Sequence, residues 1–266
     1  MDATGVPTPW TPGAGEHLAI DRTEVLRYLG YAGQEMEPEL ADRIEAVVAA
    51  LEASLAPRGV WAVFALRGTG GDAPEDTDGA PPLSLDGSTV ELAGRDIRRH
   101  LARAPWCAAL AVTLGMDVER RLRTAGSQHP LEAAVLDAAA SAAVEAAADA
   151  LNTEVEHRAA AANLLCTWRF SPGYGDLPLD AQPGLLAALN ATRLCGITAT
   201  PTNLLMPTKS VTALVGLFPQ AADADGRNQA GQAARPDARP ACATCRFASG
   251  CSLRARGETC GRSAPA

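Results

Sequence analysis

The first quarter of the chain carries the apolar spacing of two helices followed by a buried strand. Asp21 and Glu24 resemble a capping box that opens a short helix, DRTEVLRYLG. A longer helix is predicted next, because apolar residues recur at helical spacing on one face, at Leu40, Ile44, Val47, Val48, Leu51 and Leu55. Pro57 and Gly59 end that helix, so the apolar run VWAVFAL (60–66) is predicted to be a buried strand.

In the rest of the chain, strand-like and helix-like segments alternate, and strands predominate in residues 197–218. STVELAG and WCAALAVTL are predicted strands, with a short helix, RDIRRHLAR, between them. The longest predicted helix runs from Pro130 to about Ala162 and is almost unbroken in alanine, the strongest helix former. Residues 197–218 predict short strands interrupted by Pro201 and Pro207, which is typical of an antiparallel meander. This order favours an α+β fold, with helices packed on a twisted, mainly antiparallel sheet, over repeating βαβ units.

Changes in composition divide the chain into a main domain and flanking segments. Residues 1–18 are expected to be a flexible lead, and residues 19–218 form the predicted domain. Within it, residues 67–82 are polar and rich in Gly and Pro, so they are predicted to be a mobile insertion. Residues 219–240, rich in Pro, Gly, Gln and Asp, are predicted to be a linker to a small cysteine-rich tail, residues 241–266.

The composition argues against several classes of protein. Of the 266 residues, 47% are apolar, which indicates a globular chain with a sizeable core. The net charge of −8 argues against a general nucleic-acid binder, which needs a basic face. The sequence has no run of about 18 apolar residues, and the N-terminus has neither the charged nor the apolar region of a secretion signal. We therefore expect a soluble cytoplasmic protein that binds neither nucleic acid nor a membrane.

A glycine pattern after the first long strand is a weak candidate for nucleotide binding. Gly68-x-Gly70-x-x-Ala73 follows an apolar strand, as a dinucleotide fingerprint does. The fingerprint also needs a helix whose N-terminus receives the phosphates, and the following PEDTDGAPP cannot open one. We interpret the pattern as a flexible loop. The histidines are isolated in sequence and are interpreted as surface or core residues: His17, His100, His129 and His157.

The long alanine-rich helix carries two stripes of side chains. Polar residues step by four and share one face, which we call the polar stripe: Asp137, Ser141, Glu145 and Asp149. A second stripe lies about 100° away and is predicted to face the core: Leu136, Val144, Leu151 and Val155. Periodicity alone favours a solvated surface for the polar stripe. The alternative is that it borders a cleft, where its carboxylates hold a cationic ligand.

The segment RFSPGYGDLPL, residues 169–179, is predicted to be a rigid loop. Pro172 and Pro178 fix the backbone angle φ, while Gly173 and Gly175 allow angles that other residues avoid. Rigid loops commonly position groups that bind ligands. From the residues alone, the loop is about as well explained by a structural turn as by a binding site.

The cysteine-rich tail has the spacing of a metal site, Cys242-x2-Cys245-x5-Cys251-x8-Cys260. A C-x-x-C pair brings two thiolates close together, and two further cysteines complete a four-sulfur set. Zinc and an iron–sulfur cluster both suit thiolate ligands, and the spacing does not separate them. The alternative is an unstructured tail with free thiols. The other cysteines, Cys107, Cys166 and Cys195, lie in apolar segments and are interpreted as small core residues.

Four segments together resemble a known family. In order they are IRRHLARAPWCAALAVTLG (97–115), LDAAASAAVEAAADAL (136–151), RFSPGYGDLPL with Gln182, and CGITATPTNLLMPTKSVTALVGL (195–217). The chain is similar to the activation domain of cobalamin-dependent methionine synthase, in a stand-alone form, over most of residues 20–218. The most specific element is R-x-x-x-G-Y, formed by Arg169, Gly173 and Tyr174.

The resemblance implies a ligand, partners and a set of site residues. It implies that the protein binds S-adenosylmethionine and supports the reductive remethylation of cobalamin carried by a partner, a corrinoid-binding methionine synthase subunit. An electron donor such as a flavodoxin is also implied. The protein is then part of a methionine synthase system rather than a complete enzyme alone, with no catalytic residue of its own. The expected S-adenosylmethionine-binding residues are Arg169, Ser171, Gly173, Tyr174, Glu145 and Ser141.

The chain also departs from that family, and the departures leave alternatives open. The D-x-H-x-x-G signature of cobalamin ligation is absent, as are the methyl-transfer modules, and the tail has no counterpart in the large enzyme. After its tyrosine, the loop continues as GDLPL, which differs from the large enzyme. One alternative is a reactivation partner of another corrinoid methyltransferase. The other is an accessory subunit that binds S-adenosylmethionine or metal without catalysing a reaction.

Overall fold

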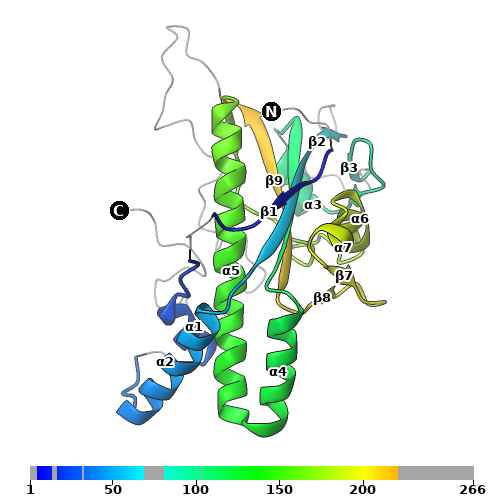
Figure 1. The fold of residues 1–266 in the computed structure, drawn as a ribbon. Coiled ribbons are helices and arrows are strands. Elements are labelled where there is room, and N and C mark those ends of the chain that lie inside the picture. The colour runs from blue at the N-terminus through cyan, green and yellow to red at the C-terminus, as the bar shows by residue number, and fades with distance from the viewer. Residues whose placement is uncertain (1–4, 14–16, 32, 69–80, 103, 221–266) are drawn as a thin grey trace, which may run out of the picture.

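A computed structural model describes residues 5–13, 17–31, 33–68, 81–102 and 104–220 (Figure 1). Most of the predicted insertion and nearly all of the predicted linker lie outside these residues. The tail lies outside them as well, and with it the proposed metal ligands Cys242, Cys245, Cys251 and Cys260. The structure therefore concerns the predicted domain and part of the lead.

The centre of the molecule is a seven-stranded sheet in which every pairing is antiparallel. Its strand order is β4-β3-β2-β5-β9-β6. The short strand β1 pairs with the same edge of β2 as β3 does, at different residues. The strands are β1 (Thr8–Trp10), β2 (Arg58–Arg67), β3 (Leu83–Leu85), β4 (Glu91–Leu92), β5 (Trp106–Thr113), β6 (Leu164–Cys166) and β9 (Ser210–Pro219). A separate hairpin joins β7 (Thr198–Ala199) to β8 (Leu205–Met206).

Helices cover both faces of this sheet (Figure 1). One face carries α1 (Arg22–Tyr28), α2 (Pro38–Glu52), α4 (Met116–Gln128) and α5 (Pro130–Ala161). The other carries the shorter helices α3 (Arg95–Leu101), α6 (Ala181–Ala188) and α7 (Ala191–Leu194). Alternate residues of β5 enter the two cores, so this strand is buried on both sides. The predicted α+β fold is confirmed.

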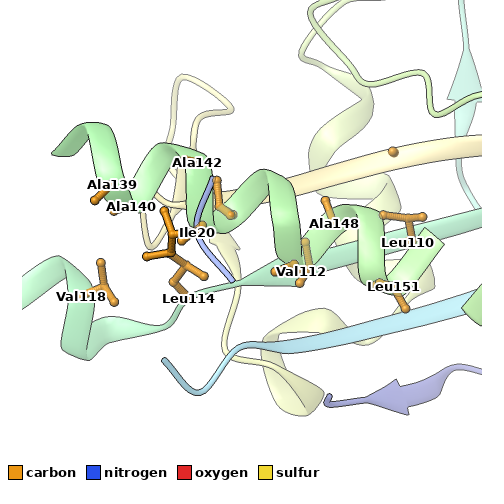
Figure 2. Packing of buried hydrophobic residues seen from close by; sticks show 14 of the residues in the cluster. Ile20, Leu110, Val112, Leu114, Val118, Ala139, Ala140, Ala142, Ala148 and Leu151 are labelled. Carbon is orange, nitrogen blue, oxygen red and sulfur yellow. The ribbon is translucent and has the colours of Figure 1, made fainter. Parts of the chain in front are cut away.

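The core on the α5 face is built largely from alanine. Small side chains let the helix axis lie close to the sheet, where Ala140, Ala143 and Ala147 are completely buried. Figure 2 shows neighbouring alanines of α5 beside Leu110 and Val112 of β5. The predicted core stripe of Leu136, Val144, Leu151 and Val155 is buried throughout. Its helical spacing therefore identified the face of α5 that packs on the sheet.

The predicted start of the first helix at Asp21 and the predicted apolar face of the second helix are also confirmed, although Glu24 pairs with Arg27 and does not complete a capping box among the described contacts. The side chain of Asp21 accepts hydrogen bonds from the backbone N–H groups of Thr23 and Glu24, at 2.8 and 3.3 Å, and caps α1. In α2, the predicted apolar face buries Ile44, Val48 and Leu51. No helix among the described residues is both long enough and apolar enough to cross a membrane.

Two predictions about backbone structure are wrong in part. The expected flexible lead contains β1, because Thr8–Trp10 pairs with residues 59–61 of β2 and Trp10 packs against the α5-face core. The expected meander of short strands includes β9, which runs unbroken for ten residues after Pro207. Pro201 and Pro207 confine the strand breaks to the β7–β8 hairpin, since neither proline can donate to a ladder. Three helices, α4, α6 and α7, were not predicted from the sequence.

Candidate ligand-binding site

The chain after β6 continues along β9 and positions Arg169. The backbone N–H of Thr167 donates to the carbonyl of Gly216 at 2.9 Å, and Phe170 and Leu214 exchange a pair of hydrogen bonds at 2.8 and 2.9 Å. At Arg169 and Phe170 the side chains point to opposite faces of the sheet. Arg169 therefore reaches α5, whereas Phe170 packs against the core on the α3 face.

Arg169 binds two carboxylates of the polar stripe through one nitrogen. Its Nη2 donates to Glu145 Oε2 at 3.1 Å and to Asp149 Oδ1 at 2.8 Å. The arginine side chain is only 16% exposed, whereas that of Asp149 is 70% exposed. Within the part of the chain that the structure describes, no hydrogen bond to Nε or Nη1 of Arg169 is found. The guanidinium is thus held from one side and keeps further donors for a ligand.

The other end of the polar stripe is paired with Lys209. Its Nζ lies 2.7 Å from Asp137 Oδ1 and donates to Ser141 Oγ at 2.9 Å, and the lysine side chain is 14% exposed. The interpretation of the stripe as a solvated face is therefore incomplete. Asp137 and Asp149 do face solvent, but each is paired with a cation that is largely buried.

The loop after Arg169 closes on itself through its backbone. Tyr174 N–H donates to the Ser171 carbonyl at 3.0 Å, and Leu177 N–H donates to the Tyr174 carbonyl at 3.1 Å. Gly173 N–H donates to the Leu177 carbonyl at 2.8 Å, with a φ of 94° that favours glycine. Leu177 is buried, while Tyr174 is 61% exposed. The loop therefore presents the tyrosine ring to solvent from a backbone that its own hydrogen bonds hold closed.

An aromatic cluster supports this segment from the α3 face. The ring of His100 lies 4.6 Å from that of Trp168 and 5.1 Å from that of Phe170, measured between centroids. His100 Nε2 lies 2.9 Å from Thr167 Oγ1, and Nδ1 is buried without a partner among the described residues. Burial lowers the pKa of His100 to about 4, so the ring is neutral at pH 7. The partly buried histidine packs against the segment that leads into the loop.

The structure brings together some of the expected site residues and separates others. Arg169 contacts Glu145, and Ser171, Gly173 and Tyr174 share the closed loop that follows it. Ser141 lies one helical turn before Glu145 and is bound to Lys209. No contact of Ser141 with the loop is found among the described residues, and its place in a binding site stays a prediction.

Two further residues belong to this region and were not among the expected site residues. Asp149 shares Arg169 with Glu145, and its spacing of four residues from Glu145 was a signal that could have identified it. Asp176 binds the start of α3 across about 80 residues of sequence, at Arg95 and Asp96. No local pattern predicts a contact over that separation.

Other parts of the described structure offer fewer groups that could bind a ligand or a metal. No group of three or more His, Cys, Asp or Glu side chains that could hold a metal is found there. Cys107 and Cys195 are buried as expected, and burial raises the pKa of Cys107 to about 12. Cys166 is only partly buried. An open pocket of about 340 Å³ lies away from Arg169, lined by Gly5, Phe64, Asp86, Gly87, Ser88, Thr89, Ala187 and Ala188.

Comparison with known proteins gives a likeness of structure. No protein-family model matches the sequence, and no curated protein matches it. Thirteen chains of solved structures match. Among them is the MetH reactivation domain bound to AdoHcy (S-adenosylhomocysteine), with a TM-score of 0.57 and 18% identity, over 81% of this chain and 79% of that chain. The chain therefore has the fold of the MetH reactivation domain, as the resemblance in sequence predicted.

Proposed function

We propose that this protein binds S-adenosylmethionine and supports the reductive reactivation of a cobalamin-dependent methionine synthase. Two lines support the proposal. The fold is shared with a reactivation domain that was solved with AdoHcy, the product left when S-adenosylmethionine gives up its methyl group. The observation that carries the proposal is local: Arg169 is fixed against Glu145 and Asp149, immediately before the closed loop that bears Tyr174.

The charges around Arg169 suit the amino-acid end of S-adenosylmethionine. That end is a zwitterion, with a carboxylate and an ammonium group on one carbon. The remaining N–H groups of Arg169 can bind the carboxylate through charge-assisted hydrogen bonds. Glu145 and Asp149, which are partly and largely exposed, can accept from the ammonium. A pair of opposite charges on the protein thus matches a pair of opposite charges on the ligand.

The loop suits the other end of the ligand. Backbone groups of the loop can bind the polar edge of adenine, and the ring of the exposed Tyr174 offers a face to the sulfonium cation or the adenine. Gly173 and Ser171 keep the backbone within reach, since neither carries a large side chain. In this arrangement the chain contributes binding and orientation, which is catalysis by positioning.

The remaining parts of the system are proposed to lie on other proteins. Cobalamin is carried by a corrinoid-binding subunit and supplies the nucleophile that takes the methyl group, so this chain needs no general base. An electron donor such as a flavodoxin reduces the cobalamin first. Spectra of this protein with cob(II)alamin should therefore show no tight stoichiometric binding. Tight uptake by this chain alone would contradict the division of labour.

The cysteine-rich tail is proposed to hold one metal site, zinc or an iron–sulfur cluster. The proposal depends on the spacing of Cys242, Cys245, Cys251 and Cys260. Protein purified without oxygen should contain about one site per chain, and changing Cys242 and Cys245 to serine should remove it. Elemental analysis that finds neither zinc nor iron would leave the tail as free thiols.

Calorimetric titration of the full chain with S-adenosylmethionine tests the proposed ligand. We expect saturable binding at one site, together with binding of S-adenosylhomocysteine at the same site. Competition between the two ligands shows that they share it. A titration without heat, supported by equilibrium dialysis without retention of ligand, would refute the proposal.

A further inference from the structure

The carboxylate of Asp176 fastens the loop of residues 171–177 to the start of α3. Its Oδ2 accepts from the backbone N–H of Arg95 at 2.7 Å, and its Oδ1 accepts from that of Asp96 at 2.9 Å. The first N–H groups of a helix have no carbonyl partner within the helix. Gly94, the residue before α3, has no side chain that could accept them. Asp176 therefore does for α3 what a capping side chain ordinarily does from the adjacent position.

Two glycines make room for this contact. A Cβ at Gly94 would lie 2.5 Å from Asp176 Oδ1, and a Cβ at Gly175 would lie 2.4 Å from Asp96 Oδ2. Both distances are far below van der Waals contact. The two glycines also have positive φ angles, 133° and 53°, that side chains disfavour. The loop and α3 can therefore approach this closely only because neither position carries a side chain.

The last turn of α3 contacts the same segment before the loop. His100 packs against Trp168 and Phe170 and lies within hydrogen-bond distance of Thr167. Asp176, near the end of the loop, binds the first turn of α3. One short helix thus contacts the chain both just before the loop and near its end, and Arg169 lies between Trp168 and Phe170. Movement of α3 relative to the loop would displace both the arginine backbone and the tyrosine.

We infer that Asp176 is a positioning residue, which holds the loop of Gly173 and Tyr174 at a fixed distance from Arg169 by fastening it to α3. The contact between Asp176 and α3 is seen in the structure. Its effect on the binding of S-adenosylmethionine rests on the proposed function. Asp176 need not touch the ligand, since its carboxylate oxygens are engaged by Arg95 and Asp96.

Calorimetry with S-adenosylmethionine on three variants tests this role. Asp176→Ala removes both hydrogen bonds and should weaken binding about five- to tenfold. Asp176→Asn keeps one acceptor oxygen and should give a smaller loss. The matched control is Asp86→Asn, because Asp86 also accepts two hydrogen bonds, from Arg67, and no contact between Asp86 and the loop is found among the described residues. The control should bind as the wild type does. All titrations are made at a temperature where circular dichroism shows each variant to be folded.

Hydrogen exchange separates the contact from its consequence. In Asp176→Ala, the amides of Arg95, Asp96, Gly173, Tyr174 and Leu177 should exchange faster, while those of β5 and β9 stay unchanged. If wild type binds S-adenosylmethionine and Asp176→Ala binds it equally well, the positioning role is overturned and the proposed function stands. If wild type does not bind, the proposed function fails. The exchange rates then decide alone, and unchanged rates in the loop would overturn the inference.

Discussion

At the N-terminal half of the polar stripe on α5, Lys209 pairs with Asp137 and Ser141, whereas two turns further on Arg169 pairs with Glu145 and Asp149. Both cations are largely buried, and both meet side chains four residues apart. The backbones that carry them differ. The carbonyl of Lys209 accepts from Leu114 at 3.0 Å, and Thr208 beside it binds Glu119 of α4 through its N–H and hydroxyl. The lysine is therefore fixed between two strands and two helices.

Arg169 has a different setting, at the edge of the sheet. Its segment pairs with β9 on one side and leads directly into the glycine-containing loop. Its ion pairs use one nitrogen, while Lys209 is bound by both a carboxylate and a hydroxyl. A buried cation over a carboxylate occurs at both ends of the stripe, so that feature alone does not distinguish a ligand site from a structural contact. We expect the neighbouring backbone to determine which of the two cations can exchange partners for a ligand.

The largest expected effect separates the two cations by ligand affinity. Arg169→Ala should weaken S-adenosylmethionine binding by about 1.5–3 kcal/mol, or about ten- to hundredfold. Lys209→Met should change it by less than about twofold. Arg158→Ala is the control for removing an exposed arginine from the domain, since Arg158 pairs only with Glu154 of the same helix among described residues. Calorimetry gives all three affinities. Equal losses of affinity in Arg169→Ala and Lys209→Met would contradict the distinction between the two ends of the polar stripe.

The second prediction is a pH dependence of stability. It is caused by His100, whose ring packs against Trp168 and Phe170 on either side of Arg169. Burial lowers the pKa of His100 to about 4 from its ordinary 6.5, so the unfolded chain takes up this proton before the folded protein does. The contribution of neutral His100 to stability is therefore fully present above pH 6.5 and is lost as the pH falls towards 4. His100→Phe keeps a ring in the aromatic cluster and removes the titration.

Urea unfolding of both proteins at several pH values measures this effect. Between pH 7 and pH 4.5, the free energy of unfolding of wild type should fall by about 2 kcal/mol more than that of His100→Phe. Carboxylates titrate in both proteins and cancel in the difference. Parallel pH profiles would mean that His100 is not held neutral by its surroundings.

The third effect is a loss of stability at the Lys209 end. Lys209→Met keeps the apolar stem of the side chain and removes its charge, so the ion pair to Asp137 and the hydrogen bond to Ser141 are lost. The free energy of unfolding should fall by about 1 kcal/mol, because Asp137 is exposed and water can replace the lysine. Thermal unfolding measures it, and an unchanged midpoint would place Lys209 outside the structural contacts that stabilise the domain.

The smallest effect is expected at Ser141, which the sequence analysis placed in the binding site. Ser141→Ala removes a hydroxyl that donates to the Asp137 carbonyl and accepts from Lys209. Affinity for S-adenosylmethionine should change by less than about twofold, since the lysine keeps Asp137. A loss of tenfold or more would show that the ligand extends to the Lys209 end of the polar stripe. That end would then belong to the binding site.

The sequence predicted which residues share a face of α5, but not which distant side chains contact each face. The period of 3.6 residues separates Leu136 and Leu151 from Glu145 and Asp149 without any knowledge of the fold. The cations over the stripe come from 20 or more residues away, and Asp176 reaches α3 across 80 and 81 residues. Periodicity is a local property, so it cannot report which distant side chain faces a stripe. Arg169 and its loop were identified through resemblance, and the contact of Arg169 with α5 is visible only in the fold.

The most direct measurement of the central claim compares two ligands on two proteins. If Arg169 binds the amino-acid end, Arg169→Ala should weaken S-adenosylmethionine about ten- to hundredfold. It should leave unchanged the affinity of 5′-methylthioadenosine, which has the adenosine and sulfur but no amino acid. Calorimetric competition gives all four affinities. Equal losses for both ligands, or no loss for either, would contradict the assignment of Arg169 to the carboxylate of the ligand.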